Sequence, residues 1–285
     1  MLVLHTSDLM GRAGHYAALA SVATAARPHV LVLGGNNFPD DSSRHPEEMG
    51  TRQPAFVLDA FRRWLGDLTR ALPGLQVATV FGNHDWLSSA AAIDELARQM
   101  PQLHVLTHER AIELAGLPFV GYSRTPPTSG YTKDFERLDL PGDLLPLVGG
   151  ARWDPVRKRA QTGPAKHQYT QFPSIGEELE RLAAPATPWV FVCHCPPHDT
   201  VLDSNFQREP IGSRGVRQAI EKRQPLLSLH GHVSSSPDIT GACQTTLGKT
   251  VAINVGQHHE ALCCALIEID IGARRIVRVD ARRPR

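Results

Sequence analysis

Gly82-Asn83-His84-Asp85 directly follows the apolar run 76–81, and this stretch decides how the rest of the chain is interpreted. Polar residues that can bind a ligand also follow four other apolar runs: Asp8 follows residues 2–4, Asn36 follows 30–33, His194 follows 189–192, and His232 follows 226–229. In open α/β sheets, ligands bind at the carboxyl ends of the strands, because the loops there converge on one crevice. We therefore expect these side chains to come together at a single site.

The N-terminal part of the chain alternates apolar runs with segments of helical spacing. We expect helices over 14–26, 54–72 and 90–100 between strands at 2–4, 30–33 and 76–81. This alternation predicts βαβ units with right-handed crossovers in a largely parallel sheet. After Leu103, short strands with tight turns predict a second, hairpin-rich sheet. The elements expected in this half of the chain are strands at 105–106, 111–114, 118–121, 189–193, 226–229, 251–254, 261–270 and 275–279, and a helix at 213–221.

Residues 123–174 contain many Pro, Gly and charged residues without a sustained period, which predicts a long irregular loop that is functional or mobile. The chain has no internal repeat and no low-complexity tract. Its length of 285 residues is near the upper size of one domain. We therefore expect residues 1–285 to form a single α/β domain with two sheets.

The composition narrows the classes of partner. Lys+Arg 30 against Asp+Glu 29 leaves a formal charge of +1, so nucleic acid or an anionic membrane is not indicated. No apolar run approaches a membrane span, and five cysteines without C-x-x-C spacing suit a reducing cytoplasm. The basic run 152–159 is interpreted as a solvated loop, with a phosphate-facing patch as the alternative.

These motifs resemble those of the calcineurin-like metallophosphoesterases, whose pattern reads D-x-H, G-D-x-x-D, G-N-H-D/E, a lone H, and G-H-x-H. The resemblance rests on residues 82–85, on His194 with Cys195-Pro196-Pro197, on Gly231-His232 and on 253–257. It covers essentially the whole chain and is weakest over 123–174. It implies an α/β fold of the metallophosphoesterase type, a two-sheet αββα sandwich with mixed sheets.

The family pattern implies two divalent metal ions that share the carboxylate of G-D and activate water for in-line attack on phosphorus. The histidine of G-N-H protonates the leaving oxygen. Transferred to this chain, one ion has the ligands Asn83, His194 and His232, while the other keeps only Asp8. His84 corresponds to the acid, and Asp85 holds the acidic position that the family often uses to orient the imidazole.

Three expected ligand positions depart from the pattern. Met10, Asn36 and Ser234 stand where the family has His, Asp and His. A thioether and a hydroxyl are poor ligands for hard divalent ions, and an amide brings no charge to share between two cations. The resemblance therefore implies one divalent ion (Mn, Fe, Zn or Ni), or none, rather than two. Candidate replacement ligands are His5, His15, His198, His258 and His259.

Two functions compete on this basis. The first is a phosphoester hydrolase with an altered, mononuclear metal site and weak activity, whose substrate is a phosphorylated small molecule or phosphoester. Its metal ligands are Asn83, His194 and His232, with Asn36 or Asp8 as a candidate further ligand. The alternative is a catalytically inactive homologue, a binding or regulatory module for a phosphorylated ligand or protein partner. Different chemistry on the same fold stays open as a third interpretation. Gly212-Ser213, at the start of a helix, is either an anion-binding turn or an ordinary N-cap.

Overall fold

The computed structural model describes residues 1–40, 46–147, 149–186 and 188–284. In this part of the chain, the first of two six-stranded sheets has the order β14-β13-β1-β2-β3-β4. Its strands are β1 (Leu2–Thr6), β2 (Val30–Leu33), β3 (Gln76–Thr79), β4 (Leu103–Val105), β13 (Cys264–Asp270) and β14 (Arg275–Arg282). The pairs from β1 to β4 are parallel, whereas β13 is antiparallel to both β1 and β14.

The second sheet has the order β11-β12-β10-β9-β6-β5. Its strands are β5 (Ile112–Leu114), β6 (Leu117–Tyr122), β9 (Val190–Cys193), β10 (Leu227–His230), β11 (Gln244–Leu247) and β12 (Thr250–Asn254). The four central strands are parallel, and antiparallel hairpins form both edges. Both sheets are therefore mixed, as expected, and the predicted fold class is confirmed.

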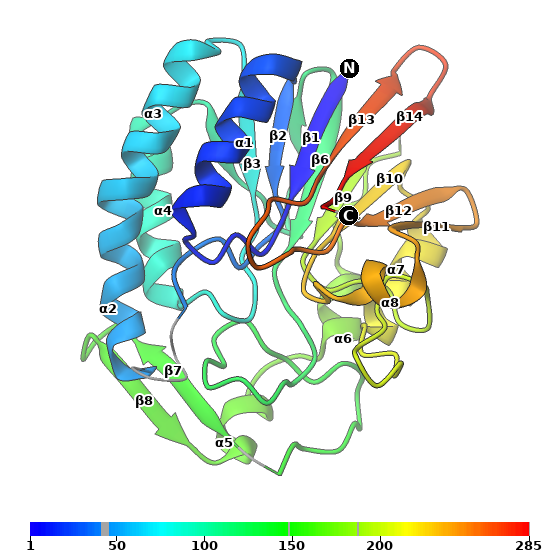
Figure 1. The fold of residues 1–285 in the computed structure, drawn as a ribbon. Helices are drawn as coiled ribbons and strands as arrows, with labels where there is room; N and C mark the ends of the chain where they lie inside the picture. Colours follow the sequence, from blue (N-terminus) through cyan, green and yellow to red (C-terminus); the bar gives the residue numbers. More distant parts are fainter. Residues whose placement is uncertain (41–45, 148, 187, 285) are drawn as a thin grey trace.

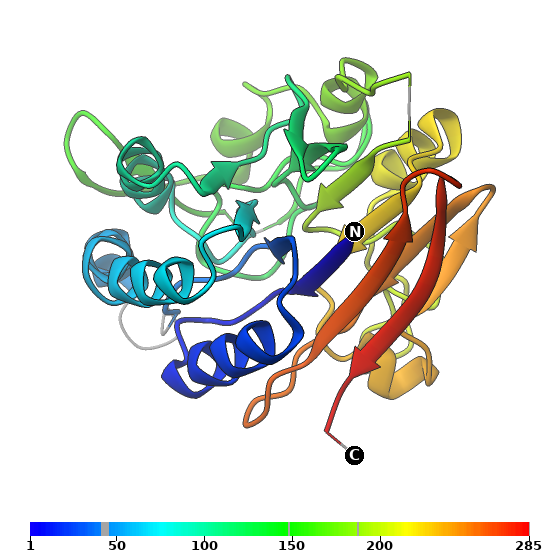
Figure 2. The same cartoon turned by 90° about the horizontal axis from the view of Figure 1, so that it is seen from above.

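Helices cover the outer face of each sheet (Figures 1 and 2). The helices are α1 (Ala13–Ala26), α2 (Pro46–Phe56), the π-helix η1 (Val57–Phe61), α3 (Arg62–Ala71), α4 (Leu87–Gln99), α5 (Ala165–Tyr169), α6 (Ile175–Glu180), α7 (Arg214–Arg223) and α8 (Ser236–Thr240). The long helices α1 to α4 lie against the first sheet, and α6 and α7 pack against the second.

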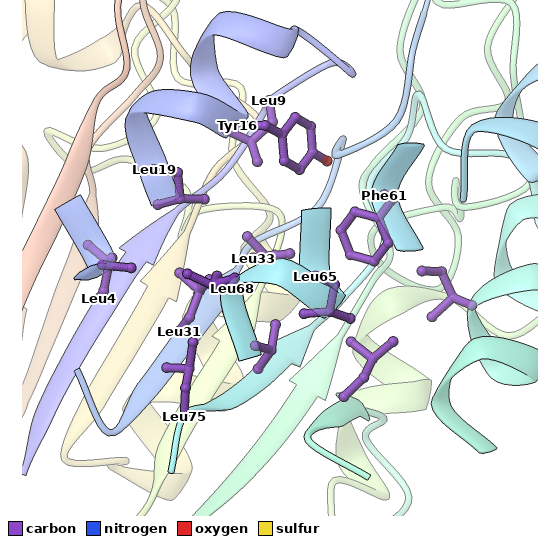
Figure 3. Close-up of a cluster of buried hydrophobic side chains, with 14 of the residues drawn as sticks. Leu4, Leu9, Tyr16, Leu19, Leu31, Leu33, Phe61, Leu65, Leu68 and Leu75 are labelled. Carbon is purple, nitrogen blue, oxygen red and sulfur yellow. The ribbon is translucent and has the colours of Figure 1, made fainter. Parts of the chain in front are cut away.

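The layers follow from the two-residue period of the strands. On β1, Leu4 faces the helices in the cluster shown in Figure 3, where it joins Leu31 and Leu65. Val3, its neighbour, belongs to a different cluster that contains Val192 of the second sheet. Successive side chains of a strand point to opposite faces. The fully apolar strands therefore fill two cores, one under the helices and one between the sheets.

The expected helix over 54–72 is longer and interrupted. Helical structure begins at Pro46, and Pro54 lies inside α2 instead of opening a helix. Proline lacks the N–H that a helix interior uses. The turn that follows it has π geometry, over Val57–Phe61, before α3 continues.

Two further expectations are corrected. The strand expected at 105–106 is β4, Leu103–Val105, and it extends the first sheet in parallel with β3 instead of opening the second. The segment 123–174 is not one irregular loop, because it contains the hairpin β7 (Gly150–Asp154) and β8 (Arg159–Gly163) as well as α5. The buried ion pair between Lys133 and Glu136, 3.0 Å long, anchors it. Residue 148 of this segment lies outside the described residues.

The position of this hairpin bears on function. Strands β1, β2 and β3 run downward in Figure 1, so their carboxyl ends face the lower part of the molecule, where β7, β8 and α5 lie. The segment therefore covers the side of the sheets on which the polar strand-end residues are found.

Candidate metal centre

The strand-end residues of both sheets meet, as expected. Asp8, Asn36 and His232 follow β1, β2 and β10, and each has a positive φ, of 57°, 53° and 66°. Non-glycine residues seldom adopt this conformation, and such strain is concentrated at functional sites. Gly35 between the sheets has φ +100°, and a Cβ there would lie 2.5 Å from Nδ1 of His194. The tight turns after the strands thus bring the side chains of the two sheets together.

The side-chain oxygen of Asn83 is the centre of the cluster. It lies 3.3 Å from Nε2 of His194, 3.0 Å from Nδ1 of His232 and 3.3 Å from Nδ2 of Asn36. The rings of His194 and His232 are 5.4 Å apart and steeply inclined to each other, at 64°. The site therefore contains one amide oxygen and two imidazoles within reach of a common point.

The protonation of His194 suits a cation at this point. Its Nδ1 donates to the carbonyl of Gly34 over 2.7 Å, so Nε2 of the neutral ring carries the lone pair. Burial lowers the pKa of His194 to about 3, which keeps the ring neutral. Two acceptors, Nε2 of His194 and Oδ1 of Asn83, consequently face each other. Such a pair fits a divalent metal ion, which would satisfy both lone pairs.

The carboxylate of Asp8 is already satisfied by donors from the protein. Its Oδ2 accepts from Oγ of Ser7 over 2.6 Å and from the backbone N–H of His232 over 3.0 Å. Its Oδ1 accepts from Nδ2 of Asn36 over 2.9 Å. The same Nδ2 lies 3.3 Å from Oδ1 of Asn83, so the amide of Asn36 joins the two halves of the cluster.

His84 lies at the edge of the cluster with its side chain 34% exposed. Its Nδ1 forms a short hydrogen bond with Oδ2 of Asp40. Burial alone would lower the pKa of His84, but the hydrogen bond and charge of Asp40, together with the charges of Asp8 and Asp85, raise it above its ordinary value. Asp40 thus stabilises the protonated ring relative to a free imidazole and occupies Nδ1, which leaves Nε2 for a ligand.

A family model for calcineurin-like phosphoesterases matches residues 1–235. The chain belongs to the calcineurin-like phosphoesterase family. Among solved structures, TT1561 of Thermus thermophilus is 17% identical with a TM-score of 0.60, over 98% of both chains. A second structure is 19% identical with a TM-score of 0.65, also over 98% of both chains. At these identities the two structures establish the fold alone. No curated protein matches the chain.

Members of the calcineurin-like phosphoesterase family typically bind divalent metals and act on phosphoesters. In the described part of this chain, no group of three or more His, Cys, Asp or Glu side chains could hold a metal ion. The donors that the structure brings together are therefore of mixed type, with amide oxygens beside the imidazoles. In the same ranges, none of the helices is long and apolar enough to cross a membrane.

The hydrogen-bond partner of the His84 imidazole is not the residue that the family pattern implies. Asp85 does not bond the ring of His84, because its buried carboxylate accepts the backbone N–H groups of Asn36, Gly82 and Phe38. It thereby fixes the two strand-end loops, and burial raises its pKa to about 7. The His84 ring forms its hydrogen bond with Asp40 instead. The sequence held a signal for this role of Asp40. When G-D-x-x-D is placed on Gly35-Asn36, its second acid falls on Pro39, next to Asp40.

The departures from the family pattern can also be located. The backbone N–H of Met10 donates to the carbonyl of Asn36, and the carbonyl of Ser234 accepts from Gln257. Over the described ranges, neither side chain makes a hydrogen bond to the cluster. Met10 has φ +50°, which continues the strained turn after Asp8.

The proposed replacement ligands lie elsewhere or are otherwise engaged. His5 is buried, and its Nε2 is 2.9 Å from the carbonyl of His230. The side chain of His198 faces Asp203 at 3.8 Å and lines a different cavity. His258 and His259 are exposed, and His15 is buried without a hydrogen bond from its ring nitrogens to any described residue.

At the helix start Gly212-Ser213, carboxylates of the chain itself accept the free N–H groups. The N–H of Gly212 donates to Asp203, and Oγ of Ser213 accepts from the N–H of Val216, as an N-cap does. The carboxylate of Asp139 takes Oγ of Ser213 and the first N–H groups of α7. Of the two interpretations of Gly212-Ser213, these contacts favour the N-cap.

Proposed function

We propose that this calcineurin-like phosphoesterase hydrolyses phosphoesters slowly, with a single metal ion held by Asn83, His194 and His232. The observation that carries the proposal is the pair of facing lone pairs on His194 Nε2 and Asn83 Oδ1, 3.3 Å apart. A cation between these atoms would replace a contact between two acceptors with two coordination bonds. The two other protein groups near Asn83 Oδ1 are His232 and the amide of Asn36.

The support for one ion instead of two comes from Asp8 and Asn36. The Asp8 carboxylate has three protein donors, so a second ion would have to compete with them for its lone pairs. Asn36 places an N–H, which repels a cation, where the family pattern has a shared carboxylate. Met10 and Ser234 occupy the two remaining positions of that second site. A group with one charged ligand and no bridge holds two cations poorly.

The chain's own residues can perform the proton transfer. When bound, the metal ion would supply a Lewis acid for a phosphoryl oxygen. His84 would give a proton from Nε2 to the leaving oxygen, because Asp40 holds Nδ1 and favours the charged ring. The amide oxygen of Asn36 accepts the backbone N–H of His84 over 2.8 Å and so fixes its position.

Elemental analysis of protein purified without chelator tests the metal content. We expect at most one divalent ion per chain, and His194→Ala should remove it. His198→Ala is the matched control, because His198 lies outside the cluster. Two tightly held ions per chain would contradict the proposed site and would direct attention to other ligands.

Activity is tested with added Mn²⁺ on generic phosphomonoesters and phosphodiesters. We expect the parent to be very slow and His84→Ala to abolish the residual rate, since the acid is lost. A parent turnover in the ordinary range of about 1–10³ s⁻¹ would show that the altered ligands do not limit catalysis.

The hydrogen bonding of the Asp8 carboxylate also favours a second function, that of a non-catalytic binding module. Asp8 needs no metal ion to be stable, and the three proposed ligands bring no negative charge. Under this alternative, purified protein would contain no metal and would show no hydrolysis that depends on His84, yet would bind a phosphorylated ligand. The metal analysis and the His84→Ala assay together decide between the two.

A further inference from the structure

A cavity of about 610 Å³ lies between the start of α4 and the segment 123–174. Cavities of this size accommodate small ligands. Its lining includes three arginines and two aromatic residues: Arg124, Arg137, Arg152, Trp153 and Phe172. Leu87, three residues after His84, also lines it, and the N–H of Leu87 donates to the Asp134 carboxylate over 2.8 Å.

The three guanidinium groups converge on one neutral atom, the carbonyl oxygen of Asp134. Arg124 and Arg137 each donate to it over 3.4 Å, and Arg152 donates over 3.2 Å. Three cations around a single carbonyl repel one another, and burial strengthens this repulsion. The arrangement is costly for folding unless an anion offsets it.

The protein supplies less negative charge than these cations require. Glu178 lies 3.6 Å from Arg137 Nε and 3.9 Å from Arg124 Nε, and it also accepts the hydroxyl of Tyr122. Arg152 has no carboxylate within 4.0 Å among the described residues. The Asp134 carboxylate faces the cavity but is bonded to the N–H groups of Leu87 and Trp153.

The remaining acids near the cavity are engaged elsewhere. Asp154 forms an ion pair with Arg157 over 2.8 Å. Glu136 forms an ion pair with Lys133 and accepts a hydrogen bond from the hydroxyl of Tyr169. Three arginines thus face two carboxylates, Glu178 and Asp134. Burial, and then the charges of Arg124 and Arg152, lower the pKa of Arg137, while Glu178 opposes this less strongly. The local balance is therefore positive.

The arginines are also held in place with donors unused. Phe172 stacks against Arg137 and Arg152, with 4.0 and 4.7 Å from each guanidinium carbon to the ring centre. The side chain of Arg137 is only 7% exposed. The Nε atoms of both arginines are buried without a hydrogen-bond partner in the described part of the chain. These enclosed donors add to the cost of burying the two charges, and the nearest acceptor to Arg137 Nε is the Glu178 carboxylate, 3.6 Å away.

A purely structural role accounts for part of the arrangement. Arg137 and Arg152 donate to the carbonyl of Glu136, and Arg152 also donates to that of Gln168. These bonds join the two parts of the segment. Arg124 takes no part in them: it is held by a 3.4 Å hydrogen bond, by Glu178 at 3.9 Å and by the ring of Phe135 at 5.1 Å, and it adds a third charge to the same cavity.

We propose that this cavity is an oxyanion-binding site in which Arg124, Arg137 and Arg152 bind a phosphate or similar group of a ligand. Guanidinium groups recognise such oxyanions through charge-assisted, often paired, hydrogen bonds. The oxyanion is either a second acidic group of the ligand at the metal centre or a separate anion. The proposal does not depend on the proposed function, because binding at the cavity can be measured whether or not hydrolysis occurs.

The test is calorimetric titration of the parent protein with inorganic phosphate in chloride buffer. Arg124→Gln should weaken phosphate binding by about tenfold or more, the loss expected for one charge-assisted contact. Arg159→Gln is the matched control, because Arg159 is exposed on the same hairpin and does not line the cavity. It should bind phosphate like the parent.

Two further variants keep the test decisive. Glu178→Gln removes a competing carboxylate and should tighten phosphate binding, whereas a purely structural ion pair predicts no gain. Binding that depends on Arg124 should survive His194→Ala. The proposal is overturned if the parent does not bind millimolar phosphate, if Arg124→Gln binds like the parent, or if His194→Ala alone abolishes binding.

The source of the oxyanion is resolved with glucose 1,6-bisphosphate and glucose 6-phosphate. If both phosphates belong to one ligand, the bisphosphate binds more tightly, and both Arg124→Gln and His194→Ala weaken it. If the anion is separate, the monophosphate binds at two independent sites, and each variant removes one of them. Either result supports an oxyanion site and distinguishes its source.

Discussion

At residue 36, one amide joins the halves of the candidate metal centre. Its Nδ2 contacts both Asp8 and Asn83, while its Oδ1 accepts the backbone N–H of His84. An aspartate there would lose the N–H that now satisfies Asp8 and would introduce a negative charge between the two halves. Under the proposed function, the side chain at this position would set how many cations the cluster can hold.

Restoring the family pattern tests this explanation. Met10→His, Asn36→Asp and Ser234→His together should add a second metal ion per chain and raise phosphoesterase activity. Asn36→Asp should contribute most, since it returns the shared charge, but it should act weakly alone because both imidazoles would still be missing. Metal content and turnover of the single and triple variants provide the measurement. A folded triple variant with no additional metal would show that the backbone has moved away from these positions.

Asp40 is predicted to act as a positioning residue for His84. Its hydrogen bond and charge raise the pKa of His84. Asp40→Asn should therefore lower this pKa, measured by NMR titration of the imidazole, and decrease turnover by about 10–100-fold without changing metal content. Asp59→Asn, at an exposed residue that pairs with Arg63, is the control. An unchanged His84 titration in Asp40→Asn would contradict the role.

At the scale of elements, Asp139 connects the segment 123–174 to helix α7. Its carboxylate accepts Oγ of Ser213 and the N–H groups of Arg214 and Gly215. An acidic group is stabilising at this end of a helix, because the unpaired N–H groups carry partial positive charge.

Removing this charge should destabilise the fold measurably. We expect Asp139→Asn to lower the free energy of unfolding by about 1–3 kcal/mol, as for other buried charged hydrogen bonds. Asp143→Asn is the control. Asp143 also pairs with Arg214, but at the surface, where an ion pair contributes about 1 kcal/mol or less. Urea denaturation of both variants gives the comparison, and equal losses would argue against a special role for Asp139.

At the scale of the whole molecule, the two sheets share one core. Val3 and Val32 of the first sheet pack in the same buried cluster as Val192 and Leu229 of the second. Neither sheet could separate without exposing this surface to water. We therefore propose that the chain unfolds as one domain, with a single calorimetric transition whose calorimetric and van't Hoff enthalpies agree. Two separate transitions would indicate two units.

The shared core also predicts acid sensitivity. His5 lies between the sheets, and burial lowers its pKa to about 4 from 6.5. The unfolded chain therefore binds more protons between these pH values, so the free energy of unfolding falls as the pH decreases from 6.5 to 4, by at most about 3 kcal/mol from this group.

Denaturation at a series of pH values measures this slope. His5→Gln should have a flatter profile between pH 6.5 and 4, because one of the buried histidines that titrate there is gone while His194, His230 and His232 remain. Its stability at neutral pH will be lower. His259→Gln, which changes an exposed histidine, should keep the slope of the parent. A parent profile that is flat over this range would contradict the assignment of a neutral buried His5.

The sequence alone was sufficient for the layered α/β fold and for the meeting of Asp8, Asn83, His194 and His232. Both follow from local patterns: apolar strands have a two-residue period, and parallel strands bring their carboxyl ends to one edge. The segment 123–174 was wrongly expected to be irregular, because the short strands β7 and β8 are held by pairing with each other and by buried contacts such as Lys133–Glu136.

Only the tertiary structure decided which side chains act together across the chain. Asp40 meets His84, Asp139 takes the helix end at Ser213, and Arg124 joins Arg152 around one cavity. No periodicity records these pairs, because each depends on where two loops from different strands arrive in space. Strand order and register set those positions, and they are fixed by packing of the whole core and not by the residues at either end of the contact.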